Sequence, residues 1–305
     1  MSHTLSRNAI VGYSAGIITG ITYGLNPLFG VPLMENGAQV ASILFFRYFF
    51  AVVLLGVFLL LKGASFRVTW RQAGILCVLG LLYTSSSLML FEAYKHIASG
   101  LATTLVFLYP VIVAIIMVFL KVMPTWQVWL SIAVTFAGVL IMTHSDSAQS
   151  LDPVGIILSV GSAASYSLFI VIINRSRSIH AISNSLLTFY ALSIGAIVFA
   201  VKALYSDVDI MVGIDSAGDW LNLLGLALLP TVVSTATLAV ATRKIGATKA
   251  SVLGVFEPVT AILVGTVVFG EILSANIITG IVLAVSAVVF MIVAAKKTPQ
   301  TETVP

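Results

Sequence analysis

Two ionisable side chains lie deep inside long apolar runs, and they are the first candidates for chemistry in this sequence. Arg47 interrupts SILFFRYFFA, and Glu257 interrupts GVFEPVTAIL. If these runs cross a bilayer, each charge costs roughly 2.5–3.5 kcal/mol on insertion scales and needs a partner or a role. Arg47 either bonds helix carbonyls, or binds a substrate carboxylate or takes part in gating. Glu257 either supports the structure or handles a proton or a cationic group, and the sequence leaves open whether the two residues pair.

Two prolines occupy matching places in the apolar runs and are the candidate hinges. Pro110 follows Tyr109, and Pro258 follows Glu257. Proline removes a backbone donor from a helix interior, and freed backbone groups at membrane depth require a polar cavity. Simple kinks are the alternative. Nearby runs rich in hydroxyl groups favour a cavity, although Ser and Thr also bond the carbonyls of their own helix.

The elements that must position these residues are transmembrane helices. Of 305 residues, 59% are hydrophobic and 9% are charged, and the mean hydropathy is +1.12. A soluble domain carries roughly 25% charged residues. The sequence therefore predicts an all-α integral membrane protein with ten transmembrane helices, whose partner is the lipid bilayer. The predicted spans are Ala9–Phe29, Ala38–Leu61, Gln72–Phe91, Ser99–Leu120, Thr125–Thr143, Val154–Asn174, Ser183–Ala203, Trp220–Ala241, Ala250–Phe269 and Ala275–Ala295.

The distribution of basic residues predicts the orientation. Twelve of the fifteen Lys and Arg residues fall on one side of the predicted spans, whereas Lys95 and Lys202 fall on the other and Arg47 lies within a span. By the positive-inside rule both termini are cytoplasmic. Scattered single bases in short loops indicate topology and no nucleic-acid partner. The lone Cys77, histidines without metal spacing and the absence of a GxxxxGK[ST] motif predict no metal, no cofactor and no direct use of ATP.

The chain contains an internal repeat. The segment from Ala93 to Pro110 matches the segment from Ala241 to Pro258 at a constant offset of 148 residues, and Tyr23 falls on Tyr166 at an offset of 143. The halves are residues 1–148 and 149–305. Since each half holds five predicted spans, an odd number, the second copy starts from the opposite side of the membrane. Such inverted repeats are typical of secondary transporters with a site near the midplane.

Inverted symmetry predicts that residues from equivalent spans of the two halves converge on one central cavity that takes a small-molecule substrate. Tyrosine suits its wall, because the ring packs against apolar groups while the hydroxyl takes a polar partner. Asn26 either lies there or only marks the external end of the first span. The predicted substrate-binding residues are Tyr23, Asn26, Arg47, Tyr83, Ser86, Tyr109, Tyr166, Thr231, Thr235 and Glu257.

The sequence also resembles the drug/metabolite transporter superfamily, in its ten-span form with two EamA domains. The resembling stretches are TYGLNPLF, SILFFRYFFA, AYKHIASGLATTLVFLYPVIVAII, ATRKIGATKASVLGVFEPVTAIL and VVFGEILS. The resemblance implies a carrier of small metabolites, most often an exporter of amino acids or related compounds across the bacterial inner membrane. The family often has tryptophan where Tyr23 precedes Gly24. A homodimer is compatible with this interpretation.

Three alternatives stay open at this point. A lipid-carrier flippase of the same superfamily would share the fold. An intramembrane enzyme would need a nucleophile with a base, or clustered acids and histidines, at membrane depth. A receptor or scaffold would need a docking surface, which the short cytoplasmic loops hardly offer.

Overall fold

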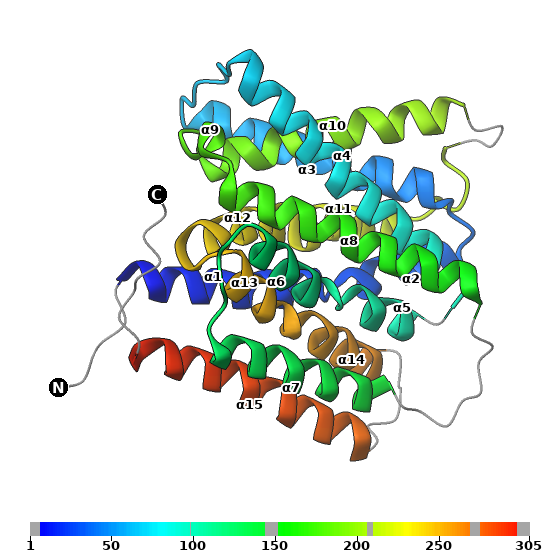
Figure 1. Cartoon of the computed structure of the whole chain (residues 1–305). Helices are drawn as coiled ribbons and strands as arrows, with labels where there is room; N and C mark the ends of the chain where they lie inside the picture. The colour runs from blue at the N-terminus through cyan, green and yellow to red at the C-terminus, as the bar shows by residue number, and fades with distance from the viewer. Residues whose placement is uncertain (1–6, 98, 144–151, 206–209, 269–274, 298–305) are drawn as a thin grey trace.

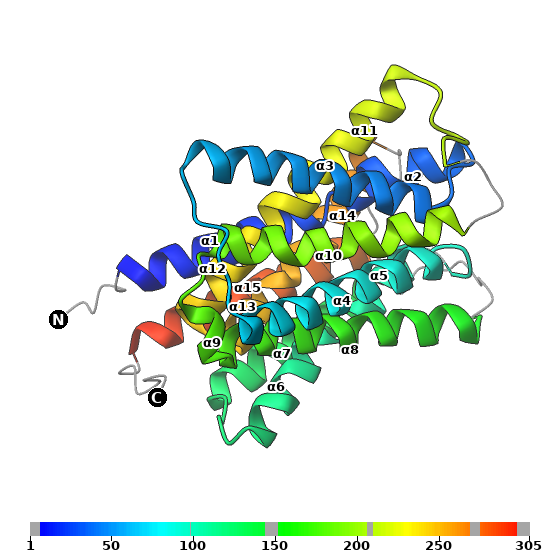
Figure 2. The ribbon, with the colours of Figure 1, turned by 90° about the horizontal axis from the view of Figure 1, so that it is seen from above.

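The structure, a computed structural model, describes residues 7–97, 99–143, 152–205, 210–268 and 275–297. These ranges contain helices and connecting turns and no strand. The long helices lie side by side in one bundle, and α1 begins on the side of the bundle where α15 ends (Figures 1 and 2). The first half contains α1 (Arg7–Tyr23), α2 (Asn26–Glu35), α3 (Val40–Leu61), α4 (Trp70–Ala93), α5 (Ser99–Val106), α6 (Tyr109–Phe119) and α7 (Trp126–Thr143).

The second half has more interruptions than the first. It contains α8 (Pro153–Arg175), α9 (Arg177–His180), α10 (Asn184–Leu204), α11 (Ala217–Ala227), the π-helix η1 (Leu228–Val233), α12 (Ser234–Ile245), α13 (Ala247–Val252), the 3₁₀ turn η2 (Leu253–Val255), α14 (Phe256–Val268) and α15 (Ala275–Lys297). Local chemistry sets several helix starts. Thr69 forms a capping box with Gln72, Asp152 caps α8, and Ser216 forms a capping box with Asp219, which satisfies backbone donors that a helix N-terminus leaves free.

Seven segments of the described chain are long and apolar enough to cross a membrane. They are Arg7–Glu35, Val40–Leu61, Trp70–Ala93, Pro153–Arg175, Asn184–Lys202, Ala217–Ile245 and Ala247–Val268. Three shorter apolar helices, Tyr109–Phe119, Trp126–Gly138 and Ile278–Met291, fall where the fourth, fifth and tenth spans are predicted. The protein is therefore a multi-pass membrane protein.

Both candidate hinge prolines lie at the start of a second half-helix, where the sequence predicts the middle of a helix. Pro110 occupies the first turn of α6, after a break at residues 107 and 108, and Pro258 is the third residue of α14, after η2. The prediction that each removes an interior hydrogen bond is wrong, because the first four N–H groups of a helix have no intrahelical acceptor. The chain is interrupted before each proline.

The structure also corrects the prediction that Asn26 marks a helix end. This residue does not mark the external end of the first span, because α2 begins at Asn26 and continues for ten residues to Glu35. Pro27 supports this start, since proline is favoured in the first turn of a helix.

The two halves pack against each other in matched pairs. Helix α1 of the first span lies along α12 of the eighth, and α8 of the sixth span lies along α4 of the third. Likewise α3 packs on α10, and α7 packs on α15 at one edge of the bundle (Figure 1). Exchanging the two halves therefore reproduces these four pairs.

Glycines allow the closest of these contacts. A Cβ atom at Gly20 of α1, or at Gly24 directly after it, would collide with Leu253, Phe256, Thr260 or the backbone of Glu257. Small residues let helix backbones approach in a membrane, where burying apolar surface gives little driving force. Gly20 and Gly24 thus allow α1 to lie directly against η2 and α14.

Candidate functional site

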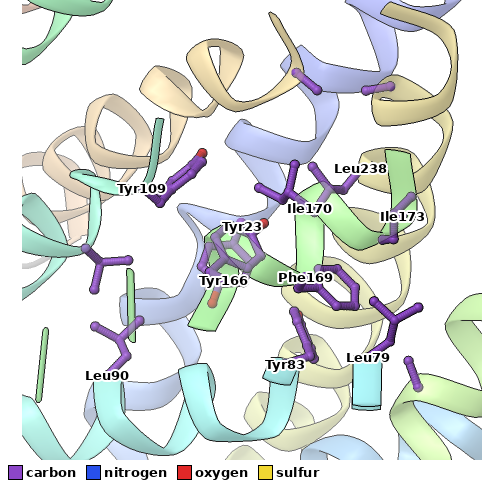
Figure 3. Packing of buried hydrophobic residues seen from close by; sticks show 14 of the residues in the cluster. Tyr23, Leu79, Tyr83, Leu90, Tyr109, Tyr166, Phe169, Ile170, Ile173 and Leu238 are labelled. Carbon is purple, nitrogen blue, oxygen red and sulfur yellow. The ribbon is translucent and has the colours of Figure 1, made fainter. Parts of the chain in front are cut away.

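A cluster of buried tyrosines lies at the centre of the bundle. The ring of Tyr166 on α8 stacks on Tyr23 with centroids 5.9 Å apart, meets Tyr109 edge-on at 4.9 Å, and lies 6.4 Å from Tyr83. Figure 3 shows Tyr23 and Tyr166 overlapping, with Tyr109 and Tyr83 to either side. The four tyrosines predicted to converge are therefore neighbours. Each of the other three rings neighbours that of Tyr166.

Helices of both halves position these rings. Tyr23 ends α1, Tyr83 lies in α4, Tyr109 begins α6, and Tyr166 lies in α8. Thr235 of α12 donates a hydrogen bond to the Tyr83 hydroxyl at 3.1 Å, so this predicted residue also borders the cluster. The hydroxyl of Tyr109 lies against Gly254 of η2, where any side chain would displace it.

Ser86 takes part in helix packing. Its hydroxyl lies 3.0 Å from the Ser162 hydroxyl, and Ser162 donates to the Ser86 carbonyl at 2.8 Å. These bonds join α4 to α8.

Arg47 is fully buried and is bonded to the π-helix. Its Nε donates to the Thr231 hydroxyl at 2.5 Å, and its Nη2 donates to the Pro230 carbonyl at 3.4 Å. The guanidinium carbon lies 5.9 Å from the ring centroid of Tyr48 and 5.8 Å from that of Phe91. Within the described ranges the Nη1 atom has no acceptor.

The π-helix exists because Pro230 has no N–H group to donate. The carbonyl of Leu226, four residues earlier, would accept that missing bond in an α-helix. The Thr231 hydroxyl donates to this carbonyl at 2.8 Å instead. Since that hydroxyl proton is committed to Leu226, its oxygen is free to accept from Arg47.

Glu257 is buried, at 5% exposed, and does not pair with Arg47. The described residues contain no ion pair to its carboxylate within 4.0 Å and no hydrogen-bond donor to it. Its backbone lies directly against Gly24, the residue after Tyr23, so it borders the same cluster.

Asn26 completes the predicted set. Its amide donates to the Tyr23 carbonyl at 2.8 Å, which places it at the break between α1 and α2, and its Oδ1 atom is buried with no donor among the described residues. Among the described residues, Arg47 Nη1 and Asn26 Oδ1 are buried without a hydrogen-bond partner beside broken helices, and Glu257 has no ion-pair partner within 4.0 Å. Such groups are the exception in folded proteins and point to a ligand or a functional role.

The sequence missed Tyr48 as a neighbour of this region. It is fully buried, its ring lies 5.9 Å from Tyr83, and its hydroxyl lies 2.8 Å from that of Ser87. Because Tyr48 directly follows Arg47 in the sequence, it could have been predicted to lie near the same site.

Away from the centre, a small cleft and one loop contact are notable. A narrow crevice too small for a water molecule lies beside Pro110 and is lined mainly by apolar residues together with Thr135. Asp152 accepts from the Val154 N–H at 2.8 Å and lies 2.7 Å from His96 Nδ1, and these two bonds hold the pKa of Asp152 below its usual value. Within the described chain no three His, Cys, Asp or Glu side chains are grouped closely enough to hold a metal ion.

Comparison with known proteins identifies a family, a similar protein and a solved structure with the same fold. The EamA-like transporter family matches twice, over residues 10–144 and 153–293. An "Uncharacterized transporter" of Archaeoglobus fulgidus is 24% identical over 269 residues, which is 88% of this chain and 92% of that protein. A solved crystal structure superposes with a TM-score of 0.78 at 15% identity, over 94% of this chain and 99% of the other, and so shares the fold.

Proposed function

Because the chain belongs to the EamA-like transporter family, we propose that it is a secondary transporter that moves a small metabolite by alternating access. The observation that carries the proposal is the tyrosine cluster lying between interrupted helices of both halves. The breaks before Pro110 and Pro258, and the π-helix at Pro230, place non-α backbone beside Tyr109, Glu257 and Arg47. Irregular backbone at membrane depth is tolerated where it is buried in protein or lines a cavity.

The architecture we propose is ten transmembrane helices in two inverted repeats, residues 1–148 and 149–305. The two family matches, one in each half, support the repeat. The matched neighbours support the inversion, since α1 on α12 and α8 on α4 are the same contact made twice. In such a protein the two units rock against each other around a fixed site.

The substrate class we propose is an amino acid or a related compound, exported across the bacterial inner membrane, with both termini cytoplasmic. Aromatic walls suit an apolar side chain, and the isolated polar groups suit the charged groups of such a molecule. The start of α1 and the end of α15 on one side of the bundle agree with an even number of spans (Figures 1 and 2). The family match favours a transporter over an intramembrane enzyme.

Counterflow in proteoliposomes tests this function. Vesicles loaded with an unlabelled mixture of L-amino acids should accumulate labelled substrate transiently, and protein-free vesicles should not. Exchange requires a carrier with one alternating site, so no chemical gradient of the label is needed. If no amino acid exchanges while a fluorescent lipid is scrambled between leaflets, the chain is a flippase of the same fold and the proposal is wrong.

A further inference from the structure

One nitrogen of the Arg47 guanidinium group has no hydrogen-bond acceptor among the described residues. The side chain is 0% exposed, and its Nε and Nη2 atoms are bonded to Thr231 and Pro230. Among the described residues Nη1 has no acceptor, and no carboxylate lies within ion-pair distance of the guanidinium. Arginine stays charged in proteins, so this is a buried positive charge without a counter-charge.

The partners of Arg47 do not depend on it. The Thr231 hydroxyl still donates to the Leu226 carbonyl when the guanidinium is removed, and the Pro230 carbonyl still accepts from the Ser234 hydroxyl. No buried polar group of η1 would therefore be left unsatisfied. An apolar side chain of similar length would also pack between Tyr48 and Phe91. Structural support of the π-helix consequently does not explain why a charge is kept here.

We propose that Nη1 of Arg47 binds a carboxylate of the transported molecule, an inference that rests on the proposed transport function. The two anchored nitrogens fix the plane of the guanidinium, so the remaining N–H groups point in one direction, as a pre-organised anion donor requires. The anion carries a single charge. Every other Lys and Arg lies at or beyond the ends of the predicted spans, so a phosphate dianion would leave one negative charge uncompensated at this depth.

The test compares acids with their amides, which differ only in the anionic group. Purified full-length protein is titrated with L-phenylalanine and L-leucine, with the amide of each, and with 3-phenylpropanoate and phenyl phosphate, and binding is read from the thermal shift. In the wild type we expect each acid to bind about tenfold or more tightly than its amide, the factor typical of one charge-assisted hydrogen bond. Phenyl phosphate should bind more weakly than 3-phenylpropanoate.

Arg47→Met separates binding from structure. It should reduce the acid-to-amide ratio to about one, and its melting temperature without added compound should equal or exceed that of the wild type, because an uncompensated charge has been removed. Arg47→Lys keeps the charge but not the fixed plane, and should keep a reduced preference for acids. Arg243→Met is the matched control. Arg243 donates to the carbonyls of Ile179 and Ile182, so this variant should melt lower and keep the full ratio.

Several outcomes would overturn the inference. These are a wild-type ratio near one, no shift by any acid, tighter binding of phenyl phosphate, or an Arg47→Met protein that melts lower but keeps the ratio. The result is independent of transport, since binding is measured in detergent. A protein that prefers acids through Arg47 but exchanges nothing in vesicles would contradict the proposed function and leave the site in place.

Discussion

At the residue scale, Glu257 is the counterpart of Arg47, because both are ionisable groups buried in the bundle. Among the described residues neither has an ion-pair partner within 4.0 Å, and they do not pair with each other. A direct ion pair would have made both of them structural. Separated, they are available for two different groups, a cation or proton at Glu257 and an anion at Arg47.

Glu257→Gln tests this role. Glutamine has the same shape, and no described residue donates to the carboxylate, so the change leaves no broken ion pair and the protein should fold and melt as the wild type does. Transport in proteoliposomes should be abolished, because the amide can neither bind a proton nor attract a cation. Glu92→Gln is the control, since Glu92 forms a partly exposed pair with Lys95 at 2.8 Å, and such pairs contribute little. If Glu257→Gln fails to fold, Glu257 is structural.

These residues also show what sequence reasoning can reach. Tyr23, Tyr83, Tyr109 and Tyr166 were predicted to converge on one cavity, and the structure groups the other three rings around that of Tyr166. The bond from Arg47 to Thr231 could not be predicted. It depends on how far α3 and η1 rotate about their own axes, which apolar runs on all sides of a helix leave undetermined. For the same reason the hydrogen bond between Ser86 and Ser162 could not be predicted from the sequence.

At the element scale, function depends on where helices are interrupted. Pro110 and Pro258 were predicted to interrupt helices, whereas the π-helix at Pro230 was not predicted. Proline alone does not tell a kink from a new helix start. The outcome depends on the residues before it. Gly254 provides the room for the Tyr109 hydroxyl at one break, and Thr231 supplies the missing donor at another.

Gly24→Ala tests the close contact between α1 and the ninth span. The added methyl group would collide with the Glu257 carbonyl and with Thr260, so α1 must move away from the break. We expect a loss of about 1–3 kcal/mol of stability, typical of overpacking, seen as a lower melting temperature. Gly74→Ala is the matched control on α4, where nothing lies within 4 Å, and it should be neutral or stabilising. If the two variants have the same melting temperature, the close packing at Gly24 does not contribute to stability.

At the scale of the whole molecule, the basic residues predict the orientation, and the packing bears on whether the two ends of the chain lie on the same side. Lys and Arg gather on one side of the predicted spans, and α1 and α15 have their outer ends on one side of the bundle (Figure 1). A reporter active only in the cytoplasm should therefore work when fused after residue 297 and fail when inserted at Asp215, which is exposed between α10 and α11. Activity at Asp215 would overturn the proposed orientation.

The last prediction concerns access to the centre. Tyr83 and Tyr166 are buried in this structure, whereas Leu60 and Val289 are 68% and 51% exposed on the outside of the bundle, where lipid surrounds the protein. In a Cys77→Ala background, Tyr83→Cys and Tyr166→Cys should react slowly with a small aqueous thiol reagent, because reaction requires the protein to open. A compound that binds between the rings should slow this reaction further. Leu60→Cys and Val289→Cys should hardly react, since lipid excludes the reagent although the side chains are exposed. If the two central positions stay inert under all conditions while positions in α3 or α10 react, the aqueous pathway runs between other helices than those that carry the tyrosines.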